Sequence, residues 1–134
     1  MRQLERDIFG IFTPHGEPGP HLMGANTLTG NNVFDHKNEE VGDIKELMLD
    51  LADGKVAYAV LSFGGARGGS EKLFTVPWSA LSLDTENRRF VLKVDKDELP
   101  KAPGFDNDDW PDMTNSKWMT DLHAYYGTDA HSLR

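Results

Sequence analysis

The chain has 134 residues, of which 38% are hydrophobic and 27% charged, with 14 basic and 22 acidic side chains and no cysteine. This size and composition are those of one ordinary soluble domain, and the absence of cysteine excludes disulfides and thiolate metal sites. No apolar run approaches the roughly 20 residues that a membrane helix needs, and no cluster of Lys and Arg is present that would favour nucleic acid or anionic membranes as partners.

The N-terminal part of the chain has the composition of an arm. The stretch MRQLERDIFGIF mixes acidic and basic side chains and lacks the basic and then apolar pattern of a signal peptide, so we expect a cytoplasmic protein. Residues 13–32 contain three prolines, four glycines and three asparagines without hydrophobic periodicity. We therefore predict an arm over residues 1–30, a domain over 31–105 and an extension over 106–134.

A β-hairpin is predicted next in the chain. Val33–His36 is a candidate short strand. Residues 43–49 could form a helix or a strand by propensity, and we assign a strand because the turn signal Asp53-Gly54 and the β-rich run 55–63 follow. Both faces of this run are apolar, which indicates burial on both sides.

Four glycines among residues 64–70 raise the question of a phosphate-binding loop. Such a loop needs Gly-Lys-Ser/Thr at the start of a helix, whereas residues 72–78 alternate like a strand. We therefore interpret Gly64–Gly69 as a hairpin loop with Arg67 as a solvated charge at its tip. A ligand contact by Arg67 is the weaker alternative.

Two further elements are expected before residue 105. Pro77 cannot donate a ladder hydrogen bond, so the preceding strand must end there or lie at an edge. Residues 88–94 alternate apolar and polar side chains, which predicts a half-buried strand. Asp95 followed by Glu98 has the spacing of a capping box and predicts a short helix over 96–101.

Several of these pieces carry a family resemblance. GDI, DGKVAYAV, LFTVPWSAL and LPKAPGF, in that order within about residues 30–105, resemble the PRC-barrel domain. This small β-barrel is shared by the photosynthetic reaction centre H subunit and a ribosome maturation factor. The segments HLMGANTLTGNNVFD and FDNDDWPDM also resemble stand-alone bacterial members of the family.

The resemblance implies a mainly β fold, a barrel of about five or six antiparallel strands. The capping patterns add a short helix after the last strand and a C-terminal helix. The resemblance also implies an adaptor function, and it transfers no site residue to this chain.

Motifs for metal binding or catalysis are not found. The aspartates of Asp106–Asp112 could offer oxygen ligands, but an EF-hand needs a Gly at its sixth position and a distal Glu, which this segment lacks. The five histidines show no zinc spacing, and no serine lies in a Gly-x-Ser-x-Gly turn. We predict a non-enzymatic protein without cofactor or metal. The alternative is a small-ligand or ion-binding protein that uses Gly64–Gly69 and Asp106–Asp112.

The C-terminal extension predicts an amphipathic helix. Thr114-Asn115-Ser116 is a cluster of N-cap residues and Gly127 is a stop signal, with a helix over 117–126 between them. Aromatic and apolar residues recur on one face and just before the helix, at Trp110, Trp118, Leu122, Tyr125 and Tyr126. This face either docks on the barrel or contacts another subunit. We predict an interaction surface for a homodimer or for another protein.

Overall fold

The computed structural model describes residues 4–6, 11–14, 22–63, 72–84, 87, 89–106 and 108–128. Its strands are β1 (Leu4–Arg6), β2 (Ile11–Pro14), β3 (Leu22–Met23), β4 (Asn32–Asp35), β5 (Glu40–Asp50), β6 (Lys55–Phe63), β7 (Lys72–Pro77), β8 (Leu81–Asp84), β9 (Arg89–Leu92) and β10 (Phe105–Asp106). Its helices are α1 (Ala25–Leu28), the 3₁₀ turns η2 (Trp78–Ala80) and η3 (Leu99–Lys101), and α2 (Ser116–Tyr126). Within these ranges, no helix is long and apolar enough to cross a membrane.

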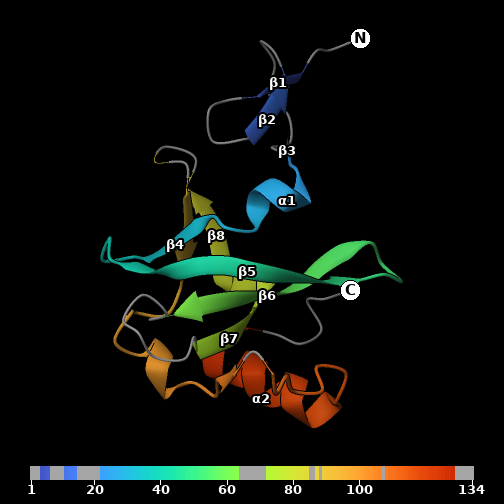
Figure 1. Cartoon of the computed structure of the whole chain (residues 1–134), viewed down its shortest axis with the longest axis vertical. Helices are drawn as coiled ribbons and strands as arrows, with labels where there is room; N and C mark the ends of the chain where they lie inside the picture. The colour runs from blue at the N-terminus through green and yellow to red at the C-terminus, as the bar shows by residue number, and fades with distance from the viewer. Residues whose placement is uncertain are drawn as a thin grey trace.

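The predicted β-rich fold is confirmed, but the predicted barrel is wrong. Strands β1, β2 and β3 form a small sheet, and a second sheet has the order β10-β7-β6-β5-β4-β9-β8 (Figure 1). This second sheet is open and contains seven strands rather than five or six. A closed barrel would require its outermost strands to pair, and among the described residues β10 and β8 remain edges.

The sheet is also mixed rather than antiparallel. β4 pairs in parallel with β9, with Val33 opposite Phe90 and Asp35 opposite Leu92. Parallel neighbours need a crossover, and here the chain between them forms β5 to β8. This long connection brings the end of β4 beside the end of β9, which positions the polar network described below.

The predicted hairpin is confirmed. β5 pairs antiparallel with β6 as far as Asp50 and Lys55, and Gly54 takes a φ of +70° in the connecting turn. Such a positive φ is readily adopted by glycine, which has no Cβ. The run with helix propensity in β5 is therefore a strand, because its pairing with β6 overrides local preference.

The core lies on both sides of β6 and β7. The register places Ala59 and Leu61 of β6 opposite Val76 and Phe74 of β7, and all four side chains are buried. The opposite face of the same strands is also buried, and α2 lies along β7 at the end of the molecule away from β1 (Figure 1). Cover on both faces explains the apolar residues on both sides of β6.

The two predicted helices differ in outcome. The C-terminal helix is confirmed: the Asn115 side chain accepts a hydrogen bond from the Trp118 N–H at 3.0 Å, and Gly127 ends α2 with a φ of +67°. The helix predicted over 96–101 is reduced to η3, without a side-chain cap, and the strand β10 follows it. The Asp95 carboxylate does not form the expected capping box because it faces His36 and Lys37.

Candidate functional site

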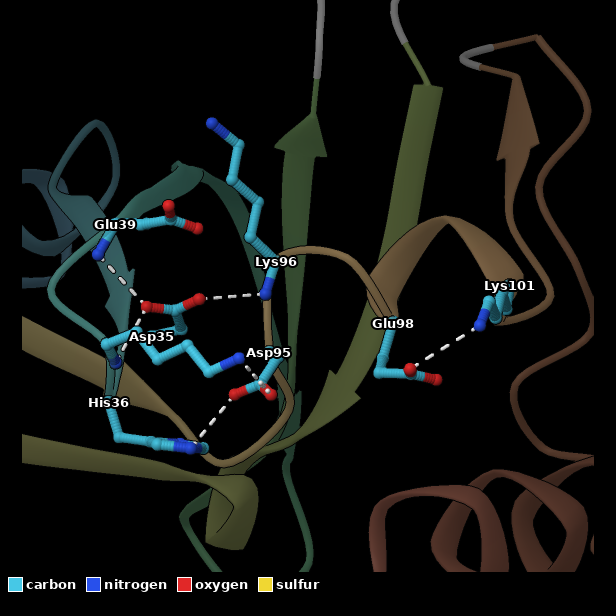
Figure 2. Close-up of polar contacts among 8 residues, drawn as sticks. Asp35, His36, Glu39, Asp95, Lys96, Glu98 and Lys101 are labelled. Carbon is cyan, nitrogen blue, oxygen red and sulfur yellow. Dashed lines mark hydrogen bonds and ion pairs between the residues drawn. The ribbon is translucent and has the colours of Figure 1, made fainter.

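A buried carboxylate joins two segments that are far apart in the sequence. Asp35, at the end of β4, has only 1% of its surface exposed. Its Oδ1 accepts hydrogen bonds from the N–H groups of Lys37 at 2.9 Å and Glu39 at 3.0 Å. Its Oδ2 accepts one from the N–H of Lys96 at 2.9 Å, beyond β9 (Figure 2). The carboxylate therefore fixes the β4–β5 turn against the loop that follows β9.

The hydrogen bonds of Asp35 decide its charge state. Burial alone would raise the pKa of this carboxyl group, but the three backbone N–H donors, aided by nearby His36, together hold the pKa below its usual value. The group is therefore an anion at neutral pH, and it gives an acceptor to three backbone N–H groups that have no other described partner.

A second carboxylate strengthens the same junction from outside. Asp95 Oδ1 lies 2.9 Å from His36 Nε2, a contact that becomes an ion pair when the imidazole is protonated, and Asp95 Oδ2 lies 3.3 Å from Lys37 Nζ. Figure 2 shows His36 pointing toward Asp95 on the side of the turn away from Lys96. His36 and Lys37 come from the β4–β5 turn and Asp95 from the loop after β9, so this network has an evident structural use.

The junction borders a depression of about 350 Å³ between the loop after β9 and helix α2. Its lining residues are His36, Lys93, Val94, Asp95, Glu98 and Tyr125. The Tyr125 hydroxyl crosses one side of it and donates a hydrogen bond to the Glu98 carbonyl oxygen at 2.8 Å. The depression thus offers charged and aromatic side chains, but its carboxylates and tyrosine already hold neighbouring turns.

The structure divides the predicted aromatic surface in two. Leu122 and Tyr126 are buried, and Trp118 is half-buried with its ring 5.5 Å from that of Tyr58 in β6. These three residues dock α2 on the sheet. Tyr125 and Trp110 stay exposed, at 38% and 37% of their surfaces.

The acidic segment Asp106–Asp112 contains a carboxylate that stabilises a turn. Asp112 Oδ1 accepts a hydrogen bond from the Thr114 N–H at 3.0 Å, and the hydroxyl and N–H of Thr114 lower the pKa of the Asp112 carboxyl group. Trp110 packs on Phe105 with 5.1 Å between ring centroids. In the described part of the chain no group of three or more His, Asp or Glu side chains is arranged to hold a metal ion. Gly64–Gly69 and Arg67 lie outside the described residues.

Among the residues that the structure describes, the most exposed large apolar side chains lie elsewhere, at the tip of the β5–β6 hairpin. We call residues 45–57 the hairpin end. Leu49 and Leu51 are 54% and 87% exposed there. Figure 1 shows this hairpin reaching beyond the other strands of the sheet.

Sequence reasoning missed Asp35, Gly42 and the hairpin end. A signal for Asp35 exists, since an aspartate directly before a polar turn commonly accepts its backbone N–H groups; its bond to Lys96, 61 residues later, leaves no local trace. A Cβ on Gly42 would lie 1.9 Å from the Ser62 carbonyl oxygen of β6. This close approach depends on register and is invisible in the sequence.

Comparison with known proteins gives one informative result. A search of curated proteins found no match. The model of the PRC-barrel domain matches residues 20–99, more than half of the chain. The chain therefore belongs to the PRC-barrel domain family.

Proposed function

We propose that this chain is a non-enzymatic interaction module, an adaptor that associates with a second copy of itself through the hairpin end. The observation that carries the proposal is the exposure of Leu49 and Leu51 within a projecting pair of strands. Isolated exposed leucines are ordinary, but two of them at the tip of one hairpin form a local apolar surface.

The strands of the hairpin end also have open edges. β4 pairs with β5 at residues 40–43 and the chain at Gly30 and Asn31 bonds to Ile44, but no described strand continues this edge to Asp50. On the other side, β7 pairs with β6 only from Tyr58 onward. Unpaired N–H and C=O groups along an edge are a template for another strand.

Charge distinguishes the hairpin end from another exposed apolar site, around Trp110. The net charge of −8 makes two copies repel each other. Trp110 stands among Asp108, Asp109 and Asp112, which adds local repulsion, whereas residues 45–57 carry two lysines and three acidic side chains and are nearly neutral. Self-association is therefore favoured at the hairpin end.

A second copy is the simplest partner for such a strand. A two-fold axis places the same edge of both copies side by side in antiparallel orientation, so that one surface complements itself. Burying the exposed parts of four leucines, two from each copy, would contribute about 4–8 kcal/mol, and association costs about 4–15 kcal/mol. We therefore expect a weak dimer, formed at high micromolar concentration.

The non-enzymatic part of the proposal is supported by how the polar side chains are used. Asp35 accepts three backbone N–H groups, and Asp95 pairs with His36 and Lys37. Tyr125 bonds to a backbone carbonyl. Each of these groups stabilises a turn, so its position is explained without a catalytic role. A cytoplasmic location is part of the same proposal, and cell fractionation tests it.

Light scattering tests self-association. We expect the natural chain to approach the mass of a dimer as its concentration rises, and the variant with Leu49→Ser and Leu51→Ser to stay monomeric. Leu22→Ser is the matched control, because Leu22 is 49% exposed but lies outside the hairpin end. A natural chain that stays monomeric, or a hairpin variant that dimerises equally, would contradict the proposal.

Small-ligand binding is a second candidate function, favoured by the depression of about 350 Å³ lined by His36, Lys93 and Tyr125. A ligand at 100 times its dissociation constant stabilises a protein by about 2.7 kcal/mol, which raises the melting temperature measurably. Because Asp95 and Glu98 also line the depression, we expect a shift in a thermal-shift panel for a small ligand that carries both a cationic and an anionic group, and a smaller shift in Lys93→Ala. A flat response across the panel argues against this candidate.

A further inference from the structure

Helix α2 covers a face of the sheet that carries polar groups. The described residues of α2 give these groups no hydrogen-bond partner. The strand register places Tyr58 and Val60 of β6 on the same face as Pro77 and Thr75 of β7. The rings of Trp118 and His123, both in α2, lie 5.5 and 5.9 Å from the ring of Tyr58. This face, which we call the helix seat, comprises Tyr58, Val60, Thr75 and Pro77.

Three buried hydroxyl groups in and near the helix seat lack a hydrogen-bond partner among the described residues. They are Tyr58 Oη, Thr75 Oγ1 and, from α2 itself, Tyr126 Oη. Each of these residues is at least nine-tenths buried. A buried hydroxyl without a partner disfavours the docked state, because the same group is hydrated when the face is open.

The helix does not depend on the sheet for its own ends. The Asn115 side chain caps its first turn, Gly127 closes its last turn, and Lys117 pairs with Asp121 at 3.0 Å along its outer side. Among the described residues, the Tyr125 hydroxyl of α2 donates a hydrogen bond to the Glu98 carbonyl oxygen. An element with its own caps can open as a unit, although release of α2 must expose the buried side chains of Leu122 and Tyr126.

From these observations we propose that α2 is a releasable cover: it leaves the helix seat while the seven-stranded sheet stays folded, and once released an 11-residue helix is only marginally stable by itself. Release uncovers an apolar face on β6 and β7. The device is separate from the hairpin end and goes beyond the proposed self-association, so either can fail alone.

Thiol labelling tests release directly, since the natural chain has no cysteine. Leu122→Cys places a thiol on the docked side of α2, and Val76→Cys places one in the core on the other face of β7. At concentrations that keep the chain monomeric, we expect Leu122→Cys to label at least about 100-fold faster, with little dependence on urea. Equal rates with equal urea dependence would show that α2 opens only by global unfolding and would overturn the proposal.

Two conservative variants sharpen the test in opposite directions. In the Leu122→Cys background, Tyr125→Phe removes the bond to Glu98 and is expected to speed labelling by about threefold or more, whereas Tyr58→Phe removes an unmatched hydroxyl and is expected to slow it. Tyr58→Phe that speeds labelling would contradict the role given to the hydroxyls.

The Leu122→Cys substitution could itself destabilise the docking of α2. Hydrogen exchange of the natural chain is the control, because it needs no substitution. We expect amides of residues 119–126 to exchange faster than those of β6 and β7, again with little dependence on urea. Exchange of all three elements through one common opening would overturn the proposal.

Discussion

At the residue scale, one carboxylate does most to fix the fold near the candidate site. Asp35 connects β4 with residue 96, and its three N–H donors come from backbone that no other described acceptor reaches. The sequence indicates that an aspartate here suits a turn. It cannot indicate the third donor, because that contact depends on the parallel pairing of β4 with β9.

Replacing this carboxylate is expected to be costly. In Asp35→Asn one side-chain oxygen becomes an NH₂ group, so that a donor faces the backbone N–H of Lys96 or of the β4–β5 turn. We expect the free energy of unfolding to fall by about 2–4 kcal/mol in urea titrations. Asp97→Asn, at an exposed position of the adjoining turn, is the control and should change it by less than about 0.5 kcal/mol.

The same residue predicts a pH dependence of stability. The pKa of Asp35 is lower in the folded chain than its ordinary value of about 3.9, so the unfolded chain binds more protons in this range. The stabilisation is fully present above about pH 4 and is lost as pH falls through the folded pKa. Urea midpoints from pH 6 to pH 2 should therefore fall less in Asp35→Asn than in the natural chain, and parallel curves would count against this assignment.

At the element scale, local signals predicted most strands and the long helix, while long-range pairing was missed. Asp53-Gly54, the alternation around Phe90, and the caps Asn115 and Gly127 act within a few residues, so their patterns are visible in the sequence. The parallel β4–β9 pair joins segments more than 50 residues apart. The mixed character of the sheet follows from that single pairing, and among the described residues the sheet is open because β10 and β8 remain edges.

Gly42 shows how closely two of these strands approach. A Cβ at this position would lie 1.9 Å from the Ser62 carbonyl oxygen, so Gly42→Ala must push β5 away from β6. We expect a loss of about 3 kcal/mol or more in the free energy of unfolding, measured in urea. Gly24→Ala is the matched control, because a Cβ at Gly24 would lie 3.7 Å from its nearest neighbouring atom. A similar loss of unfolding free energy in Gly24→Ala would mean that the effect at Gly42 is not steric.

At the scale of the whole molecule, the distribution of charge and apolar surface indicates where two copies are expected to meet. The acidic excess is concentrated in residues 95–134, which hold nine acidic and four basic side chains. Self-contact is least opposed at the nearly neutral hairpin end, where Leu49 and Leu51 are exposed. The aromatic helix, for which the sequence leaves docking on the sheet and contact with another subunit as alternatives, packs on the sheet through Trp118, Leu122 and Tyr126.

Distances between two copies test the proposed contact most directly. A nitroxide spin label on Ala52→Cys stands at the exposed tip of the hairpin end, and one on Thr120→Cys stands on the exposed side of α2; the natural chain offers no competing thiol. By pulsed dipolar spectroscopy at a concentration where light scattering reports dimers, we predict a short, well-defined distance between labels at residue 52 and a longer one at residue 120. Dimers with no dipolar coupling at residue 52, or with the shorter distance at residue 120, would contradict self-association through the hairpin end.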